Sequence, residues 1–291
     1  MKKINLIFWN SPNFGDLLSP FIVSSLSACK TYYKYKAKRW WTELIICLLK
    51  FDFSKILHIL YPWQKSLISI GSVIAWGNRQ SVVWGAGLLR RDEAVAVGRI
   101  YAVRGKYTRD VLLKKGYFVP EIYGDPAILL PLIYHPKSKM KLGKIGIIPN
   151  WEETDFFLEK YGTIYHVIDL RTDRLCDVIE DIVSCEYILS TSLHGIIVAH
   201  TYGVKALWIK KGNIQTDGIK FDDYFSSVQI DRYSPIENFD VVLMDKNNIK
   251  KLFVEKTRFI LPSPLVIDNL RKGLLLSAPF ELASEYKKYL N

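Results

Sequence analysis

Hydrophobic residues in this chain follow two alternating patterns. Short, almost wholly apolar runs are separated by longer stretches in which apolar positions recur every three or four residues. The first pattern is typical of strands buried on both faces, and the second of amphipathic helices. The expected strands are 4–9, 67–70, 82–84, 100–103, 144–149, 165–170, 187–189 and 206–209, and the expected helices are 17–28, 108–115, 152–161, 173–184, 195–202 and 264–290.

Strands that alternate with helices predict βαβ units and therefore parallel sheets. We expect an α/β fold with two Rossmann-like domains, and the segment 131–143 is the expected linker. The domains are then predicted at 1–140 and 141–262, with 263–291 packing back on the first as helix. In such folds ligands bind beyond the carboxyl ends of the strands, so the loops there are the first place to look for chemistry.

The composition limits where such a protein can work. The 291 residues are 49% hydrophobic and 24% charged, which suits a sizeable core and excludes wholesale disorder. No apolar run approaches the roughly 18 residues that span a bilayer, and 4–9 is too short for the apolar part of a signal peptide. The four cysteines form no Cys-x-x-Cys pair and have no histidine at zinc spacing. We expect a cytoplasmic protein without a metal site.

The formal net charge of +11 attracts polyanions: nucleic acid, an anionic membrane surface or a phosphorylated substrate. More than half of the excess lies in 30–65, where eight Lys and Arg side chains face only Glu43 and Asp52. The same segment is rich in aromatic and long aliphatic residues, a mixture typical of a helix in a lipid interface. The residues expected to contact a membrane or a lipid diphosphate are Lys34, Lys36, Lys38, Arg39, Trp40 and Trp41.

Two other interpretations of the segment 30–65 stay open. Its aromatic and basic residues could stack on single-stranded nucleic acid, although the many aliphatic side chains favour lipid. It could also form a solvated basic face over a buried apolar one.

Glycine-rich loops give little support to nucleotide chemistry. Gly85-Ala86-Gly87 follows an expected strand, but Arg90 stands where a dinucleotide fingerprint needs its third glycine. The chain also has no Gly-Lys-Ser/Thr phosphate loop. A tight turn after a buried strand is the preferred interpretation of these glycines.

The segment 190–195, Ser-Thr-Ser-Leu-His-Gly, lies between an expected strand and an expected helix. Its hydroxyls and the N–H groups at the helix start suit a phosphate or a carboxylate. His194 can transfer a proton near neutral pH. A capping serine beside a structural histidine is the alternative.

Charged residues beside other strands complete the candidates. Arg104 follows an expected strand, where its fork of donors can grip a carboxylate or phosphate, with a surface ion pair as the alternative. Asp16 is either a helix cap or a base facing the cleft, and Asp125 is either a ligand or a turn former. Lys210 and Lys211 add charge either to the cleft or to the surface.

Five segments, in order, resemble the polysaccharide pyruvyl transferase family. They are 13–16 (Asn-Phe-Gly-Asp), 84–88 (Trp-Gly-Ala-Gly-Leu), 101–110 (Tyr-Ala-Val-Arg-Gly, then Tyr-Thr-Arg-Asp), 124–131 (Gly-Asp-Pro-Ala-Ile-Leu-Leu-Pro) and 190–203 (Ser-Thr-Ser-Leu-His-Gly at its start, Tyr-Gly at its end). The Ser-Leu-His-Gly piece carries most of the resemblance.

The resemblance implies a fold similar to GT-B glycosyltransferases, with the active site in the cleft between two domains. It implies phosphoenolpyruvate as co-substrate, with no other cofactor. The product is a sugar with a pyruvate ketal, often across O4 and O6 of a hexose such as galactose, in a bacterial capsule or exopolysaccharide. Some members carry arginine two positions before the histidine, where this chain has Ser192, so another cation or hydroxyls must hold the donor. The segment 30–65 matches nothing in the family pattern.

Residue by residue, the resemblance implies roles. His194 is expected as general acid, Arg104 as the holder of the donor anion, and Asp16 as the group that binds or deprotonates the acceptor. The donor is expected to contact Arg104, Ser190, Ser192, Leu193, His194, Gly195 and Lys211, and the acceptor Asn13, Gly15, Asp16 and Asp125. An acceptor on polyprenyl diphosphate would place the protein peripherally on the inner face of the cytoplasmic membrane.

Three other functions fit parts of the sequence. A nucleotide-sugar glycosyltransferase of the same shape would bind UDP or GDP. A non-catalytic membrane-surface component of polysaccharide assembly would bind lipid and be indifferent to substitution of His194. A nucleic-acid binder would show steeply salt-dependent binding. The ordered segments favour the pyruvyl transferase, and no nucleic-acid partner is expected.

Overall fold

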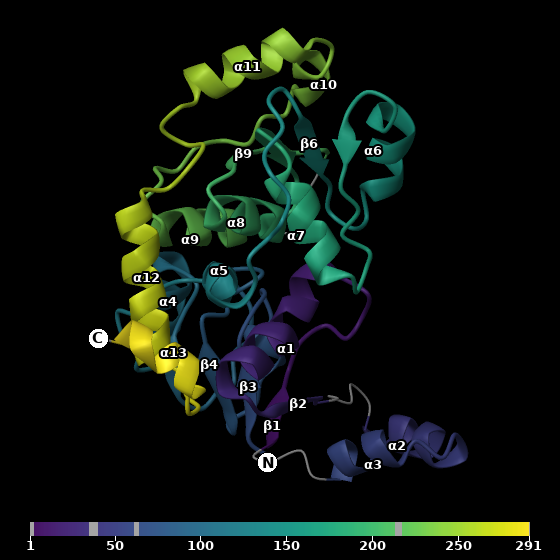
Figure 1. The fold of residues 1–291 in the computed structure, drawn as a ribbon. Helices are drawn as coiled ribbons and strands as arrows, with labels where there is room; N and C mark the ends of the chain where they lie inside the picture. Colours follow the sequence, from purple (N-terminus) through teal and green to yellow (C-terminus); the bar gives the residue numbers. More distant parts are fainter. Residues whose placement is uncertain (1–2, 35–39, 61–63, 213–216, 291) are drawn as a thin grey trace.

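The computed structural model describes residues 3–34, 40–60, 64–212 and 217–290, and these contain two β-sheets (Figure 1). The first sheet has the strand order β2-β1-β3-β4-β5, and the second has the order β7-β6-β8-β9. Neighbouring strands are parallel throughout. The strands are β1 (Lys3–Leu6), β2 (Lys30–Tyr33), β3 (Ser66–Ile68), β4 (Ser81–Trp84), β5 (Ile100–Ala102), β6 (Ile145–Ile148), β7 (His166–Val167), β8 (Tyr187–Ser190) and β9 (Lys205–Trp208).

Helices connect the strands and cover the sheets (Figure 1). The α-helices are α1 (Phe14–Ser27), α2 (Trp40–Leu49), α3 (Phe53–Leu60), α4 (Lys106–Lys114), α5 (Leu130–Ile133), α6 (Thr154–Tyr161), α7 (Leu175–Val183), α8 (Leu193–Thr201), α9 (Ile219–Ser227), α10 (Phe239–Val242), α11 (Lys246–Glu255), α12 (Pro264–Leu276) and α13 (Ser284–Lys287). Three 3-10 helices are η1 (Ile74–Trp76), η2 (Pro126–Leu129) and η3 (Lys288–Leu290).

The predicted α/β fold with parallel sheets is confirmed. Each strand expected from an apolar run has a counterpart, as β6 illustrates: all four of its residues are buried, as in a strand covered on both faces. The sequence pattern missed β2, because its residues are basic and aromatic rather than continuously apolar. It also missed α9, α10 and α11, which follow the last strand.

One continuous hydrophobic cluster extends across both sheets. It includes Leu6 of β1, Ile147 of β6 and Leu189 of β8, together with the apolar faces of α1, α8 and η2. Helix α1 packs against α7, and η2 packs against α8, so elements of the first sheet contact elements of the second directly. The two halves therefore share a core rather than being joined by a linker alone.

A fully buried ion pair also joins the halves. The Arg104 Nε atom, just after β5, donates to the Asp223 carboxylate on α9 at 3.0 Å, and neither side chain is exposed. Asp223 also accepts bonds from the backbone N–H of Thr108 at 2.8 Å and from its hydroxyl at 2.7 Å. A Cβ at Gly105 would lie 1.8 Å from the Asp223 carbonyl oxygen, so glycine is required for this approach of α9 to α4.

The end of the chain packs on the first sheet. The Trp84 indole of β4 donates to the carbonyl of Leu274 in α12 at 3.0 Å and lies edge-on to the Phe280 ring. The Arg271 side chain of α12 donates to the carbonyls of Ile128 at 3.0 Å and Thr201 at 3.2 Å. Helix α12 therefore links β4, η2 and α8.

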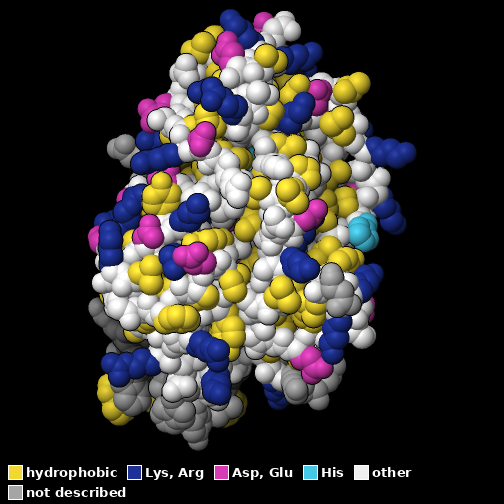
Figure 2. Space-filling model, turned by 90° about the vertical axis from the view of Figure 1, so that its left-hand side faces the viewer, with side chains coloured by type: hydrophobic (Ala, Val, Ile, Leu, Met, Phe, Trp, Pro, Cys, Tyr) yellow, Lys and Arg dark blue, Asp and Glu magenta, His cyan; other side chains and the backbone are white. Residues whose placement is uncertain are grey.

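The positive charge is dispersed on the face that carries α12. Figure 2 shows Lys and Arg side chains scattered over this face among acidic and apolar ones, rather than gathered in a continuous basic stripe. None of the helices in the described part of the chain is long and apolar enough to cross a membrane.

The buried ion pair gives a first testable prediction. Asp223→Asn leaves the Arg104 guanidinium buried without its counter-charge, which costs about 3–5 kcal/mol in comparable buried pairs. We expect a large fall in the urea midpoint of unfolding. The matched control is Asp92→Asn, which removes the exposed Arg90–Asp92 pair and should leave the midpoint unchanged. Equal midpoints for the two variants would contradict a structural role for the Arg104–Asp223 pair.

Candidate functional site

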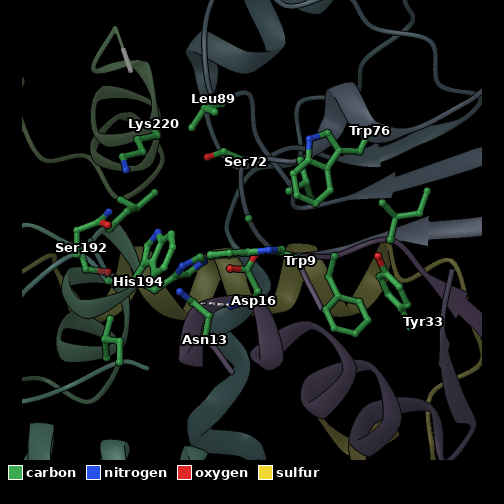
Figure 3. A pocket seen from close by; sticks show the side chains of 18 of the residues that line it. Trp9, Asn13, Asp16, Tyr33, Ser72, Trp76, Leu89, Ser192, His194 and Lys220 are labelled. Carbon is green, nitrogen blue, oxygen red and sulfur yellow. Dashed lines mark hydrogen bonds between the residues drawn. The ribbon is translucent and has the colours of Figure 1, made fainter. Parts of the chain in front are cut away.

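A pocket of about 710 Å3 opens at the carboxyl ends of the strands. Its wall includes residues that follow β1, β3, β6 and β8, together with Lys220 of α9. The two sheets therefore both contribute, as the rule for ligand sites in parallel sheets predicts. Figure 3 shows Ser192, His194 and Lys220 on one side, Tyr33 and Trp76 on the other, and Asp16 and Trp9 between them. We call these two sides the polar end and the aromatic end.

Helix α1 brings Asn13 and Asp16 to the pocket. The Asn13 side chain caps the helix by accepting from the backbone N–H of Gly15 at 3.1 Å and of Asp16 at 3.4 Å. A Cβ at Gly15 would lie 2.2 Å from Nδ1 of His194, so glycine lets the imidazole rest against the first turn of α1. The Asn-Phe-Gly-Asp segment thus has three roles. Asn13 caps α1, Gly15 leaves space for the His194 ring, and Asp16 places a carboxylate in the pocket wall.

The segment from Ser190 to Gly195 forms a tight turn into α8. The buried Ser190 hydroxyl donates to the Ile148 carbonyl at 2.8 Å and accepts from the backbone N–H of Ser192 at 3.0 Å. Ser192 caps α8 by accepting from the Gly195 N–H at 3.5 Å, and it lines the pocket with Leu193. A Cβ at Gly195 would lie 2.6 Å from the Ser190 oxygen. Ser190 and Gly195 therefore shape the turn, while Ser192 and the start of α8 face the pocket.

His194 lies in the pocket wall next to a buried carboxylate. Its Nε2 atom is 3.9 Å from Oδ2 of Asp125, and neither atom has a hydrogen-bond partner among the described residues. Burial lowers the pKa of His194 to about 3, and the charge of Arg104 adds to this effect. Burial also raises the pKa of Asp125 to about 6. The imidazole of His194 is therefore neutral at pH 7, and the carboxylate of Asp125 next to it can accept a proton.

Lys220 supplies a positive charge at the polar end. The Lys220 side chain of α9 points into the pocket (Figure 3), and within the described ranges its ammonium forms no hydrogen bond or ion pair. Burial, aided by the charge of Arg104, lowers the pKa of Lys220 to about 8. The amine is still mostly protonated at pH 7. It is a half-buried cation that lies 5.2 Å from the centre of the Phe221 ring and feels the charges of Glu153, Glu152 and Asp16.

Asp16 lies between the two ends of the pocket. Burial raises the pKa of its carboxyl to about 7, against the opposing effects of a bond from the Trp9 backbone and the charge of Lys220. Near neutral pH it is therefore divided between the acid and the carboxylate. Such a group can accept a proton from a hydroxyl and return it.

Aromatic side chains line the pocket at its aromatic end and between the two ends. Tyr33 of β2 and Trp76 of η1 form the aromatic end. Trp9, which follows β1 and lies between the ends, is edge-on to Trp151, which follows β6, at 4.9 Å between ring centroids. Aromatic rings with a few polar groups are typical of the lining of small-molecule sites.

Arg104 was expected to grip the donor, but the structure places it behind the pocket wall. Its side chain is fully buried, and its three donor nitrogens go to Asp223, to the Ser72 hydroxyl at 2.7 Å and to the Leu88 carbonyl at 2.9 Å. A Cβ at Gly87 would lie 2.3 Å from the guanidinium carbon, so the glycine makes room for this position. Arg104 touches the pocket only through Ser72.

Other expected ligands also lie elsewhere. Asp125 is fully buried and caps η2 through the Ala127 N–H at 3.0 Å, so it reaches the pocket only through His194. The Lys211 ammonium lies over the Phe156 ring at 4.3 Å, away from the pocket wall. Of the expected membrane contacts, Lys34 is buried, donates to the Gln64 carbonyl at 3.0 Å and lines the pocket. Lys36, Lys38 and Arg39 lie outside the described residues.

The sequence did not single out Lys220 or the aromatic end. No pattern around Lys220 marks it, because a lysine on a helix is ordinarily exposed and only the packing of α9 turns it inward. Tyr33 and Lys34 could have been found by the rule for strand ends, had β2 been recognised as a strand.

The polar end can bind a small, multiply charged anion. It combines the half-buried Lys220 ammonium, the N-terminus of α8 and a hydroxyl at Ser192, all of which favour negative charge. Beside them, His194 and Asp16 can move protons. The aromatic end can hold a second molecule within reach of Asp16. The arrangement fits a reaction between an anionic donor and a hydroxyl-bearing acceptor.

Comparison with known proteins gives two findings about the chain. The chain is 27% identical over 224 residues to the uncharacterized protein L143 of Acanthamoeba polyphaga mimivirus, which covers 73% of this chain and 74% of the viral protein. A sequence model of the polysaccharide pyruvyl transferase family matches residues 26–210, which is more than half of the chain and includes the turn that carries His194. On this match the chain belongs to the polysaccharide pyruvyl transferase family.

Proposed function

We propose that this transferase moves the pyruvate moiety of phosphoenolpyruvate onto O4 and O6 of a hexose, with galactose as the preferred sugar. The acceptor in this proposal is a bacterial surface-polysaccharide repeat unit carried on polyprenyl diphosphate. Family membership supports the general reaction, a transfer between a pyruvate donor and a sugar acceptor. The observation that carries the proposal is the half-buried Lys220 ammonium, which faces the same pocket as His194 and the start of α8.

The donor occupies the polar end. Phosphoenolpyruvate carries a phosphate and a carboxylate, and Lys220 and the N-terminus of α8 attract both. The family resemblance implies an arginine two positions before the histidine in some members, where this chain has Ser192. Lys220 replaces that missing cation from another helix. No cofactor besides the donor takes part in the reaction.

His194 is the general acid that transfers a proton to the donor. In the free protein the imidazole is neutral, but an anion bound beside it raises its pKa and allows it to take up a proton. Protonation of the donor's methylene carbon gives C2 oxocarbenium character, and the first sugar hydroxyl adds there with loss of its proton. The C2–O bond to phosphate then breaks, and the second hydroxyl closes the ketal. The two hydroxyl protons balance those taken by the methyl group and by the departing phosphate.

The acceptor sugar occupies the aromatic end. Tyr33 and Trp76 offer ring faces to a hexose, and Asp16 and Trp9 lie between this end and the donor. With a pKa of about 7, its carboxylate can take the proton of the attacking hydroxyl. In this proposal residues 1–140 carry the acceptor and 141–262 the donor, in the two-domain arrangement of a GT-B glycosyltransferase with the reaction between them.

Donor binding predicts a selective thermal shift. Phosphoenolpyruvate binds only the folded chain, so it should raise the melting temperature in a concentration-dependent way. At a concentration of 100 times Kd, the free energy of unfolding should increase by about 2.7 kcal/mol. Lys220→Met should abolish the shift, whereas Lys205→Met, at the exposed first residue of β9, should retain it. UDP, GDP and inorganic phosphate are the ligand controls. A shift with UDP or GDP instead of phosphoenolpyruvate would point to a nucleotide-sugar glycosyltransferase and contradict the proposal.

Proton transfer by His194 predicts a loss of turnover without a loss of donor binding. His194→Ala should lower phosphate release from phosphoenolpyruvate with a galactoside acceptor by about 10²-fold or more. The thermal shift with phosphoenolpyruvate should remain, because Lys220 and the backbone N–H groups at the start of α8 are retained. Near-normal turnover in this variant would remove His194 from the chemistry.

Asp16 predicts a pH dependence of stability. Its carboxyl titrates at 3.8 in the unfolded chain and at about 7 in the folded one, so the unfolded state loses its proton first as pH rises. The contribution of Asp16 to stability therefore falls between about pH 4 and 7 and is level above. Asp16→Asn removes this loss, so it should raise the urea midpoint more at pH 8 than at pH 5. An equal effect at both pH values would show that Asp16 is not buried as an acid.

A further inference from the structure

Helices α2 and α3 form a hairpin that lies apart from both sheets. Figure 1 shows them packed side by side below the second half of the chain, beside the first sheet. Their own small core consists of Cys47, Ile56 and Ile59, with Leu44 against it. This cluster is separate from the core that the two sheets share. The hairpin is therefore an appended unit whose outer surface has its own chemistry.

The outer face of α2 is apolar. Trp41, Ile45, Leu48 and Leu49 recur at helical spacing and are all exposed, while Leu44 and Cys47 point toward α3. A helix on the surface of a water-soluble protein normally presents polar residues on that face. Here both sides of the helix are apolar, so the outer side requires an apolar partner.

The turn of the hairpin concentrates this apolar surface. Leu49, Phe51 and Phe53 are 75%, 76% and 68% exposed, and the two phenylalanine rings lie 6.5 Å apart. Phe51 has a positive φ of 53°, a conformation that a bulky residue rarely adopts. We call these three residues the hairpin tip. Lys50, also exposed, lies between them.

Charge around the hairpin indicates which partner covers it. The segment 30–65 carries eight Lys and Arg residues against two acidic ones. Lys34 is buried and Lys55 pairs with Asp52, but Lys50 is exposed at the turn, and Lys36, Lys38 and Arg39 come directly before α2 in the sequence. Apolar side chains that insert, flanked by cations that meet anionic headgroups, match the interface of an anionic bilayer. A protein partner would need no such excess of cations.

The hairpin is continuous with the pocket. Glu43 of α2 lines the same cavity as His194, and Tyr33 and Lys34, at the end of β2, line it too. The aromatic end of the pocket therefore lies next to α2. A bilayer that holds the hairpin tip also holds the aromatic end of the pocket near the membrane surface.

We propose that the α2–α3 hairpin docks on an anionic lipid bilayer by inserting the hairpin tip among the headgroups. Docking presents the aromatic end of the pocket to molecules anchored in that bilayer. The docking stands on the hairpin alone, whereas its use for delivering a lipid-linked sugar rests on the proposed function.

Vesicle flotation of the full chain tests this inference. The tip variant is Leu49→Ser, Phe51→Asn and Phe53→Ser, where asparagine suits the positive φ of residue 51. The matched control replaces Phe118, Leu142 and Val254 by serine, three side chains that are 75–86% exposed in two loops and on α11. Because the tip is exposed, the tip variant should keep the wild-type melting temperature.

We expect wild type and control to float with vesicles that contain phosphatidylglycerol, and less with phosphatidylcholine alone. The tip variant should bind at least about tenfold more weakly, since three large apolar side chains no longer enter the lipid. Equal flotation of the tip variant and wild type, or no flotation of wild type, would overturn the docking. So would a wild-type dimer that the tip variant converts to monomers without any lipid binding, because the face would then join two copies.

The thermal shift with phosphoenolpyruvate separates this inference from the proposed function. Flotation that depends on the tip, in a chain that phosphoenolpyruvate does not stabilise, would support docking and count against the proposed donor. A normal thermal shift in a chain that does not float with vesicles would support the proposed donor and contradict the docking.

Discussion

The ion pair between Arg104 and Asp223 is the contact on which the pocket depends. It is fully buried, and it fixes α9 against the end of β5 and the start of α4. Lys220 lies one turn before Asp223 on the same helix, so the contact that anchors α9 also directs the ammonium into the pocket. On its other side Arg104 holds the Ser72 hydroxyl in the pocket wall. Arg104 is thus a positioning residue that orders both sides of the polar end.

Burial disfavours the charged forms of Lys220 and His194, and a bound anion would offset this effect. Burial lowers the pKa of Lys220 to about 8 and of His194 to about 3, which means that positive charge there is unfavourable in the empty pocket. It raises the pKa of Asp16 to about 7 for the same reason. A donor with several negative charges would reverse the effect on Lys220 and His194 and stabilise their protonated forms. A neutral ligand would have no such effect on the two pKa values.

The sequence predicted the parts of the site that depend on local rules. Asn13, Asp16, Ser192 and His194 follow strands, and the rule for strand ends together with the capping pattern brought each of them to the pocket. The backbone of Arg104 also lies at the end of a strand, β5, as the same rule predicts. The direction of its side chain is decided by Asp223, 119 residues later in the chain, which no local pattern reveals.

Other parts depend on tertiary packing or on an unusual composition. Lys220 is turned inward only because α9 packs on α4, so nothing in its neighbourhood distinguishes it from an exposed lysine. The strand β2 was hidden by its lysine and tyrosines, and with it the fact that Lys34 faces the pocket. The hairpin was recognised as basic and amphipathic from the sequence, but the structure was needed to show that its apolar residues face outward.

We propose that the donor binds between Lys220 and the start of α8. A crystal structure of the chain with phosphoenolpyruvate would show this binding position. We expect a phosphate or carboxylate oxygen within ion-pair distance of Nζ of Lys220, the other anionic group at the N-terminus of α8, and the methylene carbon facing His194. Phosphoenolpyruvate bound at the aromatic end, or bound without a contact to Lys220, would rule out this position of the donor.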